Sequence, residues 1–252
     1  MFAVSTDPIT LILVVIGALL AGFTTGFAGF GTGLVASSLW FHALPAAMVP
    51  PLIALASVAA QIVGLITVRK SFNRARTMPF LGGGVIGVPL GVTALAAASP
   101  FLLRTSIGVF LITYALYQLL RRSKHGIGNW GGRAADGVVG IGGGFFGGFA
   151  GLSGPLPLVW LQLRGGSTDA QRATYQPFNL IVLALACCGM ALNGQITSDV
   201  LWITAICLPA TLIAAWLGAR IYVGVSPQTF QRVVLLIMLV SGSILIAQAV
   251  AR

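Results

Sequence analysis

The sequence predicts an all-α polytopic membrane protein built from two inverted four-element repeats, each opening with a helix that is broken at glycines. Three observations predict this fold class: an apolar composition, eight long apolar stretches, and a glycine motif that occurs twice. Hydrophobic residues make up 57% of the 252 residues and charged residues only 7%. Soluble domains carry about 25% charged residues. So few charges cannot cover a water-facing surface, and most of the surface must therefore face lipid.

The apolar stretches supply the elements of this fold. A helix needs about 20 apolar residues to cross a bilayer. Eight stretches reach that length: 9–40, 44–68, 78–98, 101–120, 135–163, 173–193, 199–222 and 228–250. The polar joint from Arg121 to Arg133 lies near the middle of the chain. It divides the chain into a first repeat, 1–125, and a second repeat, 126–252, within one integral membrane domain.

The opening stretch of each repeat has a glycine-rich centre. The segment Gly26–Gly33, GFAGFGTG, is matched half a chain later by Gly148–Gly154, GFAGLSG. A continuous helix over 9–40 would be about 48 Å long at 1.5 Å per residue, whereas the hydrocarbon core is about 30 Å thick. Glycine permits the sharp turns that an interruption needs. We therefore expect 9–40 and 135–163 either to tilt strongly or to turn back within the membrane.

The basic residues favour the second arrangement. If all eight stretches crossed the membrane, the basic residues would divide nine to five between its sides. If the two opening stretches re-enter, the second repeat is inverted relative to the first, and only Arg104 and Arg252 lie on one side. The other side then holds these twelve: Arg69, Lys70, Arg74, Arg76, Arg121, Arg122, Lys124, Arg133, Arg164, Arg172, Arg220 and Arg232. Cytoplasmic loops are enriched in Lys and Arg, so this division predicts the inverted topology.

The two glycine motifs are the candidate binding site. A helix that begins after a break has unpaired N–H groups and the positive end of its dipole there. Two such ends that face each other would bind an anion near the midplane. Thr32 and Ser153 are expected at equivalent places, where each hydroxyl could cap the new helix or contact a ligand, and Pro155 suits a first helical turn. The candidate residues of the motifs are Gly29, Gly31, Thr32, Gly33, Gly151, Ser153 and Gly154.

Three amides lie within apolar stretches: Gln61, Gln176 and Asn179. A polar side chain in lipid is costly, so each should face protein or a cavity. A ligand contact and a hydrogen bond between helices both remain open for them. No basic residue is expected deep in the membrane. Some glycines can instead serve close helix packing, and two sets have the four-residue spacing for this: Gly83, Gly87 and Gly91, and Gly143, Gly147 and Gly151.

Several kinds of ligand are disfavoured. Cys187, Cys188 and Cys207 lie in apolar stretches without the spacing of a metal site or a disulfide framework, and no cofactor is predicted. The net charge of +10 resides at loop ends, without the interleaved aromatic residues of a nucleic-acid groove. The expected partners are a small anion and the lipid bilayer. The oligomeric state is open, with a homodimer as one option.

At the paired glycine motifs, the sequence resembles the TauE/SafE family of sulfite exporters and related permeases. The resemblance extends over nearly the whole chain, including the two repeats and the basic central joint. It implies a transporter, not an enzyme, that exports sulfite, sulfonates such as sulfoacetate, or other small sulfur-containing anions across the bacterial inner membrane. The exact substrate, the coupling ion and the direction of transport do not follow from it.

Alternatives come from other classes. An anion channel, or a carrier for another small anion such as a carboxylate, would use the same helix ends. The segment 151–154 fits the Gly-x-Ser-Gly pattern of intramembrane serine proteases, with His42 as a base, but duplication already explains this motif. The segment 142–147 matches the glycine pattern of dinucleotide-binding enzymes. It lacks the preceding strand and following acid that this function needs.

Overall fold

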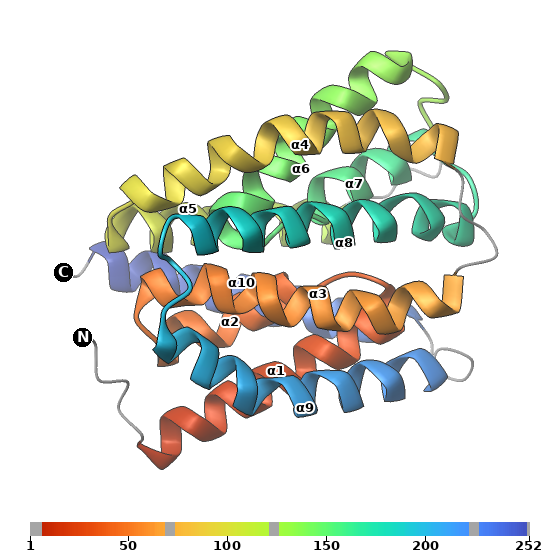
Figure 1. The fold of residues 1–252 in the computed structure, drawn as a ribbon. Helices are drawn as coiled ribbons and strands as arrows, with labels where there is room; N and C mark the ends of the chain where they lie inside the picture. The colour runs from red at the N-terminus through yellow and green to blue at the C-terminus, as the bar shows by residue number, and fades with distance from the viewer. Residues whose placement is uncertain (1–6, 69–73, 121–125, 222–226, 251–252) are drawn as a thin grey trace.

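The computed structural model describes residues 7–68, 74–120, 126–221 and 227–250 (Figure 1). Within these ranges the chain is helical and contains no β-strand, and each of the eight apolar stretches forms helix as predicted. The helices are α1 Pro8–Ala28, α2 Thr32–Ala43, α3 Val49–Val68, α4 Arg74–Ala97, α5 Pro100–Leu120, α6 Gly132–Ala150, α7 Pro155–Arg164, α8 Thr168–Leu192, α9 Ser198–Ile221 and α10 Pro227–Val250. A short 3₁₀ helix, Ala46–Met48, precedes α3.

Six of the described helices are long and apolar enough to cross a membrane: α1, α3, α4, α5, α8 and α9. Large apolar side chains project from the outside of the bundle, such as Ile66 at 73% exposure and Val138 at 68%. Exposed apolar side chains at this density are tolerated in lipid and not in water. The chain is therefore a multi-pass membrane protein.

The first apolar stretch forms two antiparallel helices, α1 and α2. The hydroxyl groups of Thr25 and Thr32 hydrogen-bond beside the break. Farther from it, the indole N–H of Trp40 donates to the carbonyl oxygen of Val14 at 3.0 Å. Residues at increasing distance before the break thus contact residues at increasing distance after it, which is the contact pattern of a hairpin. The chain reverses at Gly29 and Gly31, whose φ angles are 80° and 110°. The predicted interruption of 9–40 therefore lies at the predicted glycines.

The second opening stretch forms a matching hairpin from α6 and α7. Gly151 ends α6 with a φ of 71°, and α7 begins at Pro155. At the open end of the hairpin, Asp136 is buried and accepts from Trp160 Nε1 at 2.7 Å. Arg164 forms an ion pair with the same carboxylate at 3.0 Å. This charged pair joins the start of α6 to the end of α7.

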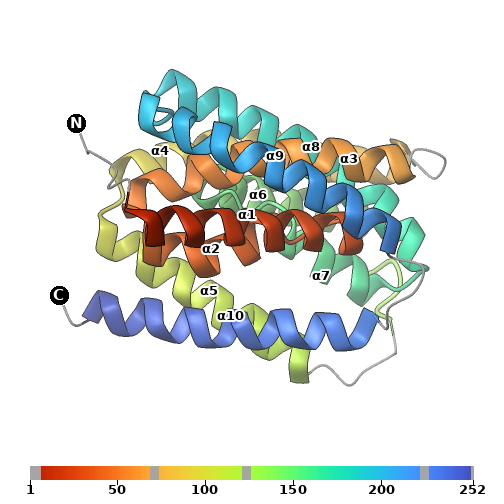
Figure 2. The ribbon, with the colours of Figure 1, turned by 90° about the horizontal axis from the view of Figure 1, so that it is seen from below.

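Helices of one half pack mainly against helices of the other. The main partners are α1 with α9, α4 with α6, α5 with α10, and α3 with α8 (Figures 1 and 2). Gly83, Gly87 and Gly91 of α4 lie against the backbone of α6, so their predicted role in close packing is confirmed. Two glycines of the other set also allow close packing, because Gly143 lies against Phe178 of α8 and Pro157 of α7, and Gly147 lies against Val182 of α8. The α6 glycines that contact α4 are Gly140, Gly144 and Gly148.

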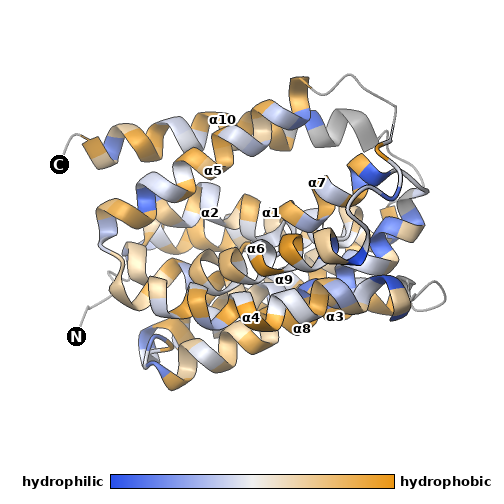
Figure 3. Cartoon of the chain, turned by 90° about the horizontal axis from the view of Figure 1, so that it is seen from above, coloured by the Kyte–Doolittle hydropathy of each residue, from blue (hydrophilic) through white to orange (hydrophobic). Residues whose placement is uncertain are grey.

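The described basic residues gather at one end of the bundle. Arg74 and Arg133 begin α4 and α6, whereas Arg164 and Arg220 lie at the ends of α7 and α9. These helix ends lie on the right in Figure 1, and hydrophilic residues are concentrated at the same end in Figure 3. Arg104, near the start of α5, lies toward the opposite end. We call the arginine-rich end the basic end. Six of the basic residues counted above lie outside the described ranges: Arg69, Lys70, Arg121, Arg122, Lys124 and Arg252.

Candidate functional site

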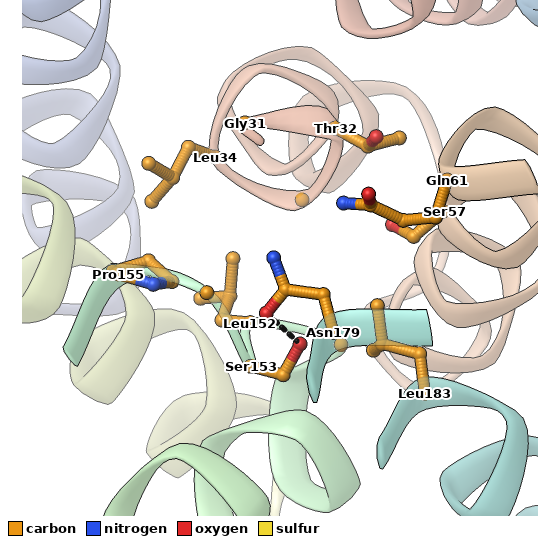
Figure 4. Close-up of a pocket in the computed structure, with 13 residues that line it drawn as sticks. Gly31, Thr32, Leu34, Ser57, Gln61, Leu152, Ser153, Pro155, Asn179 and Leu183 are labelled. Carbon is orange, nitrogen blue, oxygen red and sulfur yellow. Dashed lines mark hydrogen bonds between the residues drawn. The ribbon is translucent and has the colours of Figure 1, made fainter. Parts of the chain in front are cut away.

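The two helix breaks meet inside the bundle and enclose a polar pocket. A methyl group on Gly33 would lie 2.7 Å from the Leu152 side chain and 2.8 Å from the Gly151 carbonyl oxygen. The breaks thus touch, although more than one hundred residues separate them in sequence. The pocket is lined from the first break by Gly31, Thr32, Gly33 and Leu34, from the second by Gly151, Leu152, Ser153, Gly154 and Pro155, and otherwise by Ser57, Gln61, Asn179 and Leu183 (Figure 4).

The short helix α2 begins at this pocket. Its first hydrogen bond to the preceding turn runs from Val35 N to Gly31 O at 3.0 Å. The N–H groups of Thr32, Gly33 and Leu34 therefore have no acceptor within α2. All three residues line the pocket. The positive end of the α2 dipole adds to their attraction for an anion.

The helix α7 also begins at the pocket, but it supplies fewer donors. Pro155 opens the helix, as predicted, and Pro157 follows two residues later. Proline has no N–H group, so Leu156 is the one N–H donor among the first three residues of α7. The two helix ends are therefore unequal, and α2 provides most of the backbone donors that the pocket can offer.

Thr32 and Ser153 do not occupy equivalent places, contrary to the sequence prediction. The first break spans three residues between helices and the second spans four. Thr32 consequently starts α2, whereas Ser153 precedes Gly154, the residue before α7. Neither side chain caps a helix. The Thr32 hydroxyl bonds with that of Thr25, and Ser153 Oγ donates to Asn179 Oδ1 at 3.1 Å.

Two of the three predicted amides line the pocket. Gln61 on α3 and Asn179 on α8 both direct their amide groups into it (Figure 4). Ser57, one turn before Gln61 on α3, joins them, and its buried hydroxyl has no hydrogen-bond partner. Sequence reasoning missed Ser57, although it lies four residues from Gln61, the spacing that places two residues on one helical face.

Gln176 and Gly29 lie beside the pocket and do not line it. Gly29 ends α1, and the carbonyl oxygens around it receive donors from neighbouring helices. Tyr175 Oη donates to Ala28 O at 2.7 Å, and Gln61 Nε2 approaches Gly29 O at 3.5 Å. Gln176 is fully buried next to Gly29. Eight of the ten predicted site residues therefore share the pocket, and these two lie on its border.

Arg172 is buried inside the bundle near the basic end, and the expectation that no basic residue lies deep in the membrane stays a prediction. The helix α8 begins at Thr168, five residues before the apolar stretch, and therefore includes Arg172. Arg172 is 4% exposed, and its guanidinium donates to Gly26 O at 3.4 Å. A cation at the C-terminal end of α1 is favourably placed to interact with the helix dipole.

The pocket has an accessible volume of about 20 Å³. A space of about 10–15 Å³ holds one water molecule, and the conformation is therefore closed around a volume smaller than a polyatomic anion. Its walls carry hydroxyl, amide and backbone N–H groups, but no lining residue is charged. Such a pocket can bind by hydrogen bonding and by helix dipoles, and it offers no group for covalent chemistry except the hydroxyls.

The alternative active sites find no support in the geometry. Ser153 bonds with Asn179, whereas His42 bonds with Ser241 at 3.1 Å and with Gln248 at 3.3 Å. A serine protease would need a direct hydrogen bond between its serine and its histidine. The glycine pattern at 142–147 lies within α6, and the described residues before it contain no strand. Among the described residues, no cluster of His, Cys, Asp or Glu is suited to hold a metal ion.

A helical bundle with six candidate membrane spans among its described helices, and with two hairpins whose breaks meet at one pocket, defines a multi-pass membrane protein with the features of a transporter. The family model described as "Sulfite exporter TauE/SafE" matches residues 14–245, and the chain therefore belongs to this family of membrane transporters. No curated protein and no solved structure gives a significant match.

Proposed function

We propose that this chain exports small sulfur-containing anions, such as sulfite or a sulfonate, across the bacterial inner membrane. The observation that carries the proposal is the meeting of the two helix breaks at one buried polar pocket. The starts of α2 and α7 direct partial positive charge into this pocket, while Thr32, Ser153 and Asn179 supply hydrogen-bonding groups. Membership of a sulfite exporter family supports a sulfur oxyanion as the ligand.

We further propose that 1–125 and 126–252 are inverted repeats. In this arrangement helices α1 to α5 correspond in order to α6 to α10. Exchanging corresponding helices turns the α1–α9 contact into the α6–α4 contact, and it leaves the α3–α8 and α5–α10 contacts unchanged. Each half also opens with a helical hairpin. An inverted pair of this kind supports alternating access, because one half can rock against the other around a fixed site.

The basic end would face the cytoplasm by the positive-inside rule. An inside-negative potential then drives an anion outward by about 2.3 kcal/mol per charge for each 100 mV. Export therefore needs no coupled ion in this account. Loading requires the two breaks to separate, because the closed pocket holds about 20 Å³.

Efflux from proteoliposomes tests this proposal. Vesicles that contain the purified chain and are loaded with sulfite should release the sulfite in a saturable manner once an outward driving force is applied. Sulfite-loaded vesicles without the protein should not release it. Gly154→Val is the diagnostic variant, because a methyl group on Gly154 would lie 2.9 Å from Asn179 Nδ2 within the pocket. A folded variant with wild-type efflux would place the site elsewhere. Preferential efflux of acetate would support a carboxylate carrier, and large single-channel currents would support a channel.

A further inference from the structure

One face of α8 is polar from the basic end to the pocket. Arg172, Gln176 and Asn179 have the i, i+4, i+7 spacing that places side chains on the same helical face. At 1.5 Å per residue, Arg172 and Asn179 are about 10 Å apart along the helix axis. Asn179 lines the pocket, whereas Arg172 lies in the second turn of α8, whose first turn is at the basic end. The polar face therefore leads away from the pocket toward the basic end.

The facing helix α3 presents a similar surface. The same spacing relates Ser57, Gln61 and Gly64, and Gly64 meets the polar face of α8 at Gln176. A methyl group on Gly64 would lie 2.9 Å from Gln176 Nε2 and 3.9 Å from Gln61 Oε1. The glycine therefore lets the amides of two different helices approach each other between the pocket and Arg172.

Gly29 closes this region from a third side. With a φ of +80°, it ends α1, and a methyl group on it would lie 2.6 Å from Arg172 Nε and 2.7 Å from Gln176 Nε2. The first helix break thus covers the same two side chains that connect the pocket to the basic end. A movement of the α1–α2 hairpin away from α8 would uncover them together.

Three amide atoms in this region lack hydrogen-bond partners. Gln176 is fully buried, and neither its Nε2 nor its Oε1 forms a hydrogen bond. Gln61 is 2% exposed, and its Oε1 is also unpaired. Buried polar groups without partners are rare in proteins and costly to folding. Their presence next to a binding pocket indicates that a ligand supplies the missing partner for part of the transport cycle.

Arg172 supplies the charge that the pocket lacks. Its side chain is buried beside Gly29, and its guanidinium contacts the end of α1 through Gly26 O. Guanidinium groups bind planar and tetrahedral oxyanions through two parallel hydrogen bonds. The Gly26 carbonyl oxygen therefore contacts this cation one helical turn from Gln176.

We propose that Arg172, Gln176 and Gln61 form a second anion position, on the basic side of the pocket, through which a small sulfur oxyanion passes to reach the pocket. This inference rests on the proposed export function. Arg172 attracts the anion from the basic end, the amide of Gln176 receives it, and Gln61 transfers it to Thr32 and Asn179. The position is closed in this conformation, where Gly29 and Gly64 fit against Gln176.

Gln176→Leu separates this role from a structural one. A structural role predicts a variant that transports sulfite like the wild type and is at least as stable, because an unpaired buried amide has been replaced by an apolar side chain of similar size. The proposal predicts that stability is retained, while sulfite efflux at low internal sulfite falls about tenfold or more, as expected when a ligand loses a hydrogen-bonding partner. The matched control is Thr211→Val, which removes another buried polar group without a hydrogen-bond partner. Thr211 lies on α9 and does not line the pocket, so this variant should leave efflux unchanged.

Arg172→Lys and Arg172→Gln supply a second measurement. The lysine variant keeps the charge and should raise the KM for sulfite, while the glutamine variant should raise it much further. Equal KM values for both variants and the wild type would overturn the inference, even if the substitutions changed the stability of the protein. If Gln176→Leu does not fold, Gln176→Met tests the same step with the same expectation. Absence of sulfite efflux from wild-type vesicles would instead refute the proposed function itself, whereas a working wild type with an equally active Gln176→Leu variant would refute only the second anion position.

Discussion

Gly33 of the first helix break lies against the carbonyl oxygen of Gly151 in the second, where a methyl group on Gly33 would come within 2.8 Å of that oxygen. The contact joins the two halves of the chain at the place where both opening hairpins reverse. It makes a single pocket out of two separate breaks, and the pocket therefore depends on how closely these two backbones approach.

Gly33→Ala should consequently destabilise the protein and reduce transport. The added methyl group has no space between Gly151 and Leu152, and overpacking of this kind costs about 1–3 kcal/mol. Sulfite efflux and thermal unfolding in detergent measure the two effects. The matched control is Gly82→Ala in α4, where nothing lies within 4 Å of the added methyl group. Equal losses of efflux in the two variants would contradict the assigned role of Gly33.

Asn179→Asp should abolish anion transport with little change in shape. The substitution places a negative charge in a pocket that contains no basic residue, and repulsion between like charges costs several kcal/mol. We expect sulfite efflux to fall about a hundredfold or more. Asn193→Asp makes the same change at the exposed C-terminal end of α8 and should transport normally. Wild-type efflux by a folded Asn179→Asp variant would mean that the anion does not pass this residue.

The ion pair between Asp136 and Arg164 should stabilise the second hairpin without contributing to anion binding. Both side chains are almost completely buried. Asp136→Ala leaves the Arg164 charge without its partner, and removal of one member of a buried pair typically costs about 3–5 kcal/mol. The double variant Asp136→Ala, Arg164→Met should recover part of that loss in a thermal unfolding experiment. A double variant less stable than Asp136→Ala would show that the pair does not act as a unit.

Cysteine labelling tests the proposed inverted topology. Asn129 and Ser167 flank the α6–α7 hairpin, whereas Asn193 follows α8. A single cysteine is introduced at each position and treated with a membrane-impermeant reagent. Cysteines at 129 and 167 should react from the same side of the membrane, and a cysteine at 193 should react from the opposite side. The three native cysteines are first replaced by alanine: Cys187, Cys188 and Cys207. If Asn129→Cys and Ser167→Cys react from opposite sides, α6 and α7 together cross the membrane and the inverted topology is wrong.

Glycine spacing made the breaks predictable. The length of 9–40 and the repeated motif are incompatible with one straight helix across a 30 Å core, and the interruptions occur within both motifs. The lengths of the breaks were not predictable, because one extra residue between Gly151 and Pro155 depends on local packing. The predicted equivalence of Thr32 and Ser153 failed for a different reason, because alignment of the two motifs from Gly26 and Gly148 places Thr32 opposite Gly154.

The sequence also contained an unused signal for Arg172. The residues before 173 are polar and resemble a loop, but Ser167 accepts from Ala170 N and Asp169 lies in the first turn, both typical of a helix start. With α8 extended to Ser167, the spacing of Arg172, Gln176 and Asn179 would have placed all three on one face. The burial of Arg172 and Gln176 against Gly29 depends on packing between the halves, which no local pattern reveals.

Binding of the anion between the two helix breaks can be seen by diffraction from crystals soaked in selenite, because selenite is the selenium analogue of sulfite and selenium can be located by its anomalous scattering. We predict an anomalous peak between the two helix breaks, within hydrogen-bonding distance of Thr32 and Asn179, and no such peak in crystals of the Asn179→Asp variant. An ordered wild-type structure with no peak at the breaks at saturating selenite, or with its only peak elsewhere in the bundle, would contradict this prediction.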